Sequence, residues 1–170
     1  MRRLLSLALI GLFGLFCLQL SFAQEDKRRQ EGAKQPIAFN HKLHAEAGLH
    51  CTSCHSKAES KDQAGIPNVK DCLACHRKFQ TTGATLQTLV AYEKAQREIP
   101  WVRIYKLPSF VFFGHQAHLK AKADCTTCHG AVQTREVLWQ EKEISMTACL
   151  NCHKERNAST ACNLCHELSR

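Results

Sequence analysis

Hydrophobic and polar residues are divided sharply along this chain of 170 residues. An uncharged apolar run, Leu4 to Leu20, follows two arginines. After it, Ser21 and Ala23 provide small residues at the −3 and −1 positions of a cleavage site. This pattern is typical of an export signal over residues 1–23. Because the run is near the short limit for spanning a bilayer, two outcomes stay open: a cleaved signal or a retained membrane anchor.

The segment 24–36 is polar and lacks large apolar residues, so we predict a disordered tether there. The remainder shows one clear helical period, over Thr85–Glu98, which Pro100 is expected to end. Residues 101–113 are rich in aromatic and β-branched side chains and are predicted to run extended. Elsewhere we expect short helices joined by loops, which gives a mostly α, loop-rich fold.

Cysteine and histidine carry the chemistry. The pentapeptide Cys-x-x-Cys-His occurs five times and uses ten of the eleven cysteines and five of the ten histidines. It is the attachment signature of a c-type haem, in which both thiols bond the porphyrin and the histidine binds iron as the proximal ligand. The sequence therefore predicts a multihaem cytochrome c with five covalent haems. The copies, numbered here as sites 1 to 5, are Cys51-Cys54-His55, Cys72-Cys75-His76, Cys125-Cys128-His129, Cys149-Cys152-His153 and Cys162-Cys165-His166.

Zinc and redox disulfides also use Cys-x-x-Cys pairs, but neither needs a histidine directly after every pair, so both rank below haem. The eleventh cysteine, Cys17, lies in the apolar run and is expected to leave with the signal. Covalent haem attachment takes place outside the cytoplasm. The motifs and the signal thus agree on an exported protein, either periplasmic or at the extracytoplasmic face of the membrane.

Residues 37–170 provide about 27 residues per haem, too few for a conventional core around each one. We therefore expect the haems themselves to form the core, and the chain to be unfolded without them. The formal charge of +8 falls to +6 without the signal, and ten haem propionates offset the rest. Lysines and arginines are expected to balance propionates and to dock redox partners, and no nucleic-acid function is predicted.

The sequence also repeats internally. Phe39-x-His41-x-x-His44 precedes site 1, and Phe113-x-His115-x-x-His118 precedes site 3 with every position shifted by 74 residues. Sites 2 and 4 follow within each repeat, and site 5 comes last. We therefore divide residues 37–170 into a two-haem module (37–80), a haem-free connector (81–108) and a three-haem module (109–170).

The repeated histidines are candidates for the second axial position of the haem iron, the distal ligand. Two imidazoles give a closed iron of comparatively low potential. In each pair the histidines are three residues apart, so both rings point to one side of a helical turn and can serve two neighbouring haems. Four distal ligands are predicted in this way: His41, His44, His115 and His118.

The fifth distal ligand stays open between three alternatives. Met146 lies three residues before Cys149 and would raise the potential of its haem. His50 directly precedes Cys51, where it cannot easily reach the far face of its own haem but can serve another haem. The third alternative is an open or water-bound iron, which could perform chemistry rather than only pass electrons.

The Phe-x-His-x-x-His lead before Cys-x-x-Cys-His resembles the class III multihaem cytochromes c, which are small electron carriers. The resemblance implies that His41 pairs with His55 and His115 with His129, while His44 and His118 reach other haems. A closer likeness covers Pro36 to His153. The runs PIAFNHKLHAEAGLHCTSCH, AGIPNVKDCLACH, IPWVRIYKLPSFVFFGHQAHL and ISMTACLNCH are similar to the pentahaem subunit of alternative complex III, a quinol-oxidising membrane assembly.

Three functions follow from these observations. The first is an electron carrier between redox partners, with no catalytic residues of its own. The second is the same carrier as a fixed subunit of a membrane quinol-oxidising respiratory complex. The third, ranked lowest, is a small-molecule reductase at an open haem, for which the sequence shows no proton-donor constellation.

Overall fold

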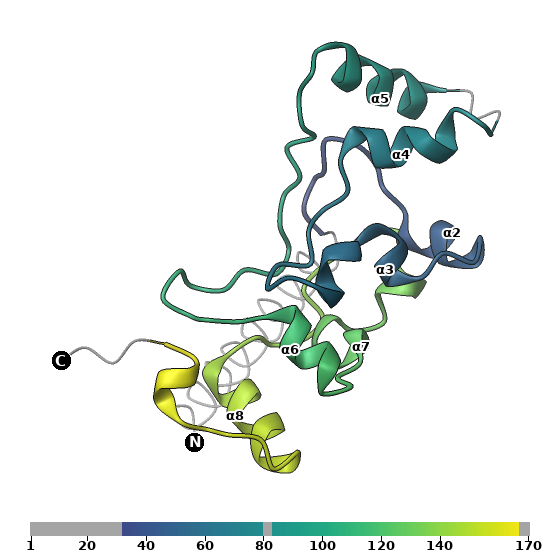
Figure 1. Ribbon diagram of the computed structural model, residues 1–170. Helices are drawn as coiled ribbons and strands as arrows, with labels where there is room; N and C mark the ends of the chain where they lie inside the picture. The colour runs from purple at the N-terminus through teal and green to yellow at the C-terminus, as the bar shows by residue number, and fades with distance from the viewer. Residues whose placement is uncertain (1–31, 80–82, 167–170) are drawn as a thin grey trace, which may run out of the picture.

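The computed structural model describes residues 32–79 and 83–166. The predicted export signal and most of the tether lie outside the described residues. Within those two ranges the chain forms short helices and loops without a β-strand, which confirms the mostly α, loop-rich prediction (Figure 1). The same residues contain no helix long and apolar enough to cross a membrane.

Each histidine pair opens a short helix, α2 (His41–Glu46) in the first module and α6 (His115–Lys120) in the second. Both helices end in a left-handed residue, Gly48 at φ 83° and Lys122 at φ 55°. In both, the next backbone N–H bonds the carbonyl of the second histidine, at 3.1 Å for His44 and 2.9 Å for His118. This is the same helix-ending motif at positions 74 residues apart.

The attachment motifs form helices as well, and side-chain caps explain where several of them begin. Asn68, Asp124 and Ser145 each accept a backbone N–H in the first turn of the helix that follows. The attachment helices are α3 (Cys51–Cys54), α4 (Val69–His76), α7 (Cys125–His129), α8 (Met146–Glu155) and the 3₁₀ turn η3 (Cys162–Leu164).

The two modules hold each other by exchanged contacts. Helix α2 packs on η2 (Val132–Thr134) of the second module, and α6 packs on η1 (Ser56–Glu59) of the first. The N–H of Lys42 donates to the carbonyl of Arg135 at 3.0 Å, and the N–H of Gln116 donates to that of Lys61 at 3.2 Å. The first bond becomes the second when 74 is added to the residue number in the first module and subtracted from the residue number in the second. The modules are therefore related by a local two-fold pseudosymmetry, as in an isologous dimer.

The only buried apolar cluster of the described residues lies at the first module, where α5 (Ala84–Lys94) packs on α4. Its members are Ile37, Val69, Leu73, Leu89 and Ile99. A cluster of this size leaves most of the chain without a protein core, in line with the expectation that haem supplies the rest.

Two predictions for the connector need correction. The helix predicted over Thr85–Glu98 ends at Lys94, because Gln96 adopts a left-handed φ of 50° and the N–H of Arg97 closes the end on the carbonyl of Tyr92 at 3.1 Å. Residues 101–113 are not continuously extended. Val111 N–H bonds the Pro108 carbonyl at 3.0 Å, which makes a turn inside this segment.

Candidate haem sites

The structure brings three of the predicted distal histidines beside motif histidines. The ring centroids are 6.1 Å apart for His44 and His76, 6.3 Å for His115 and His129, and 6.1 Å for His118 and His153. A metal–imidazole bond is about 2 Å long and the bonding nitrogen lies about 1 Å from the ring centroid, so two axial imidazoles have centroids about 6 Å apart. These three separations therefore leave room for one iron each.

The fourth distal histidine, His41, lies beside His55. Burial first, then the neighbouring His55 and His44, lower the pKa of His41 to about 4. Burial, followed by His115 and His55, also lowers the pKa of His129. Both imidazoles are thus neutral at physiological pH, which is the form that binds iron.

Hydrogen bonds at the other ring nitrogen fix several of these imidazoles. The Nδ1 atoms of His44 and His118 each lie 2.7–2.8 Å from a backbone carbonyl four residues earlier, Asn40 and Gly114 respectively. His115 Nδ1 lies 2.8 Å from the carbonyl of Asp62, in the other module. An Nδ1–H donated to a carbonyl leaves Nε2 unprotonated and free to bind a metal.

Two motif histidines are held in the same way, with Nδ1 2.7 Å from the Gly65 carbonyl for His55 and 2.6 Å from the Ser159 carbonyl for His153. His41 differs, since its Nδ1 is buried without a partner. The residues present therefore fit haem: imidazoles lie in pairs at the spacing of two axial ligands, and each motif histidine directly follows a Cys-x-x-Cys pair.

The carbonyls that orient these histidines could not be found from the sequence, because any backbone carbonyl can accept. The phenylalanines could be found, since they belong to the repeat. Phe39 stacks on His44 at 4.4 Å, and Phe113 lies 4.5 Å from His118. Tyr105 was missed. Its hydroxyl donates to the His129 carbonyl at 3.0 Å and its ring meets the His129 ring edge-on at 4.7 Å.

None of the ten motif cysteines is paired in a disulfide, and those of different sites lie near one another. Burial raises the pKa of five of these thiols, and for Cys54 and Cys72 the carboxylate of Asp71 follows. Neighbouring thiols from other sites add to each shift, which joins Cys54 with Cys72 and Cys75, Cys125 with Cys51, Cys128 with Cys149 and Cys152, and Cys149 with Cys165. Each contact joins neighbours in the row of sites 2, 1, 3, 4, 5. Figure 1 shows the corresponding helices in the same order, from α4 through α3, α7 and α8 to the C-terminal turn.

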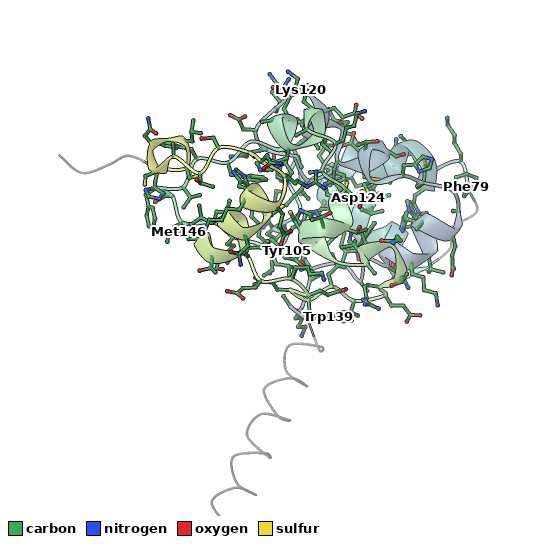
Figure 2. All side chains as sticks on the ribbon, turned by 90° about the horizontal axis from the view of Figure 1, so that it is seen from below. Phe79, Tyr105, Lys120, Asp124, Trp139 and Met146 are labelled. Atoms are coloured by element: carbon green, nitrogen blue, oxygen red, sulfur yellow. The ribbon has the colours of Figure 1, made fainter. Side chains whose placement is uncertain are left out.

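The remaining candidates for the fifth iron lie far apart. His50 precedes α3, where its N–H donates to Ser53 Oγ at 3.2 Å, at the junction of sites 1 and 3. Met146 is the first residue of α8, beside the C-terminal segment that carries site 5, and 67% of it is exposed (Figure 2).

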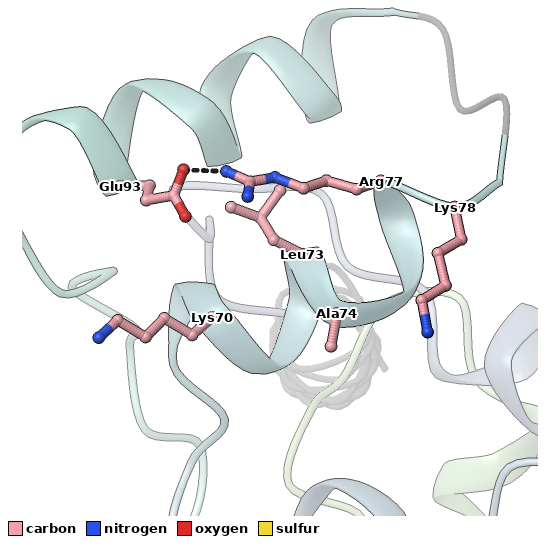
Figure 3. A pocket seen from close by; sticks show the side chains of 6 residues that line it. All are labelled: Lys70, Leu73, Ala74, Arg77, Lys78 and Glu93. Atoms are coloured by element: carbon pink, nitrogen blue, oxygen red, sulfur yellow. Dashed lines mark hydrogen bonds and ion pairs between the residues drawn. The ribbon is translucent and has the colours of Figure 1, made fainter.

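A pocket lies between α4 and α5, and neither cysteine of site 2 lines it (Figure 3). Arg77 pairs with Glu93 across it. Its lining residues are Lys70, Leu73, Ala74, Arg77, Lys78 and Glu93. No group of three or more histidine, cysteine, aspartate or glutamate side chains in the described ranges is arranged to hold a metal ion.

Comparison with known proteins agrees with this geometry. The family model described as cytochrome c3 matches residues 43–103, and that of cytochrome c7 and related cytochrome c matches residues 111–167. The chain is therefore a class III multihaem cytochrome c, a haem-binding electron-transfer protein. The multihaem cytochrome c subunit of menaquinone reductase from Nitratidesulfovibrio vulgaris (strain Hildenborough) is 29% identical in an alignment of 162 positions. The alignment covers 79% of this chain and 77% of that protein.

Proposed function

We propose that this chain is an exported cytochrome with five haems that carries electrons along the row of sites 2, 1, 3, 4 and 5. The observation that supports this most is the set of three imidazole pairs at 6.1–6.3 Å. When bound, haem supplies one-electron redox chemistry, and the protein sets its spacing, axial ligands and exposed edges.

The chain's own residues hold neighbouring sites together. Helix α2 provides His41 to site 1 and His44 to site 2, and α6 provides His115 to site 3 and His118 to site 4. Within each module, one turn of helix thus fixes the separation of two irons. The contact between the thiols of Cys51 and Cys125 joins sites 1 and 3, and so the two modules, into one row.

Closed axial pairs favour electron transfer over catalysis. An iron with two imidazole ligands has no position left for a substrate. Four of the five sites are of this kind in our assignment, so we infer that the chain transfers electrons and that any reaction on a substrate takes place in a partner.

We further propose that the partner is a quinone-linked membrane complex. The relative named as a menaquinone reductase subunit supports this, since it and this chain match over most of their lengths. The likeness to the pentahaem subunit of alternative complex III points to the same kind of assembly. A free carrier between soluble redox proteins is the second candidate.

Two measurements test these proposals. The holoprotein, produced with the haem-attachment machinery, should contain five haems by mass and by pyridine haemochrome, and four or fewer would contradict the five-site assignment. Affinity purification of the full chain from solubilised membranes should recover a complex that exchanges electrons between a menaquinone analogue and the haems. Recovery of the chain alone, in the soluble periplasmic fraction, would favour the free carrier.

A further inference from the structure

Helices α4 and α8 carry equivalent sites, 2 and 4, and can be compared position by position. Adding 77 to a residue number of α4 gives the matching residue of α8, so Cys72 matches Cys149. The capping residues match as well, because the Asn68 side chain accepts from the Asp71 N–H at 3.3 Å and the Ser145 side chain accepts from the Ala148 N–H at 3.2 Å. In this alignment the first helical residues, Val69 and Met146, are equivalent.

The two equivalent residues have opposite environments. Val69 is 6% exposed because α5 covers its face of α4. Met146 is 67% exposed, and no described helix of the second module corresponds to α5. Site 5 adjoins this part of α8 instead. The Cys149 thiol lies beside that of Cys165, and the Phe112 N–H bonds the Cys165 carbonyl at 2.6 Å.

The histidines outside the motifs are accounted for by other sites. His44, His115 and His118 lie 6.1–6.3 Å from the motif histidines of sites 2, 3 and 4, and His41 lies beside that of site 1. Among the described residues no ring contact joins His166 to another imidazole. The last histidine, His50, adjoins the thiols that join sites 1 and 3, and sites 3 and 4 lie between it and site 5 in the row.

We propose that the thioether of Met146 is the distal ligand of the iron at site 5, opposite His166. This assignment rests on the proposed five-haem function. One turn of helix places Met146 and Cys149 on the same face of α8, the face whose thiol meets site 5. A methionine thioether opposite histidine raises the potential of a haem above that of a bis-histidine haem. Site 5 would therefore be the high-potential end of the row.

The test is near-infrared magnetic circular dichroism of the ferric holoprotein, in which a methionine-ligated low-spin haem gives a sulfur-to-iron charge-transfer band that a bis-histidine haem lacks. We expect this band at an intensity of one haem in five. Met146→Leu should abolish it and let one haem per chain bind carbon monoxide after reduction, because leucine keeps the volume but cannot bind iron. Met146→His should also abolish it, but with all haems low-spin and the highest of the five potentials shifted down.

Phe79→Leu is the matched control, since Phe79 is 68% exposed and lies at the other end of the molecule (Figure 2). It should leave the band unchanged.

A wild-type protein with five haems and no band overturns the assignment, whether or not it binds carbon monoxide. So does a band that survives Met146→Leu. Fewer than five haems in the wild type would instead contradict the proposed function, and the haem count keeps the two failures apart. Should Met146→Leu fail to fold, the wild-type spectrum still decides.

Discussion

The two modules use the same inner parts and end in different ways. Toward the centre, α2 and α6, their helix ends and their exchanged backbone bonds match under a shift of 74 residues. At the outer end of the first module, α5 covers α4. Leu73 of α4 and Leu89 of α5 are each 3% exposed there. At the outer end of the second, α8 has no buried residue and adjoins site 5. A protein core closes one end of the row, and the proposed haem of site 5 takes its place at the other.

This difference explains the uneven distribution of apolar residues. An 11-residue helix that packs on α4 needs apolar residues such as Leu86, Leu89 and Val90 along one face. The proposed haem of site 5 would bring its own apolar surface. The segment 156–166, which carries this site, can therefore be short and polar. Substitutions at the two ends should therefore have different effects.

Removal of site 5 should unfold the outer end of the second module only. In the double variant Cys162→Ala, Cys165→Ala, we expect α8 to lose amide hydrogen-exchange protection relative to the wild type, because no protein core covers it. Amides of α4 and α5 should keep their protection and serve as the internal control. Equal loss at both ends would show that the two ends are not independent.

Truncation of the protein core should weaken the first module. Leu89→Ala removes a side chain that is 3% exposed and should lower the free energy of unfolding by about 2–4 kcal/mol. The control Leu107→Ala, at 38% exposure in the connector, should cost less than about 1 kcal/mol. Guanidinium denaturation followed by helical circular dichroism measures both. Similar losses would contradict a core centred on the contact between α4 and α5.

The outer distal histidines should be interchangeable in effect. His44→Ala and His118→Ala each open one iron, so each variant should gain one high-spin haem by electron paramagnetic resonance and bind one carbon monoxide when reduced. His50→Ala is the matched control and should leave all haems low-spin. Our pairing would be refuted if His50→Ala contained an open haem. It would also be refuted if His44→Ala or His118→Ala contained no open haem.

The smallest effect is expected from an ion pair within the second module. Arg135 hydrogen-bonds Glu141 and holds the pKa of that carboxyl below its ordinary value. Because the folded-state pKa is depressed, the pair stabilises the protein at pH values above the ordinary carboxyl pKa, and this stability is lost as the pH falls through the lower, folded value. The melting temperature of Glu141→Gln should lie slightly below that of the wild type at neutral pH and converge with it in acid. A constant difference across that range would show that the charge has no role.

The sequence carries more information on the haem-binding motifs of this molecule than on its packing. Sites 1 to 5 and both histidine pairs could be read because covalent attachment requires fixed residue types at fixed spacing. The pairings of His44 with His76 and His118 with His153 could not, since the direction in which each ring points depends on how the modules dock. The exchanged bonds of Lys42 and Gln116 were invisible for the same reason: backbone groups leave no mark in a sequence.

The early end of α5 has a different cause. Gln96 is not a typical left-handed residue, so nothing in the sequence placed the helix end before Pro100. Met146 lies between these cases. Its type suggested a ligand, but only the comparison with Val69 on α4 connected it to site 5.

Low-temperature electron paramagnetic resonance of the ferric holoprotein, together with carbon monoxide binding to its reduced form, tests the account most directly. We predict five low-spin haems and no carbon monoxide adduct, because our assignment gives every iron two protein ligands. A high-spin signal from one or more haems in the wild type, with carbon monoxide bound at the same haems after reduction, would contradict the account and make catalysis at an open iron the next question.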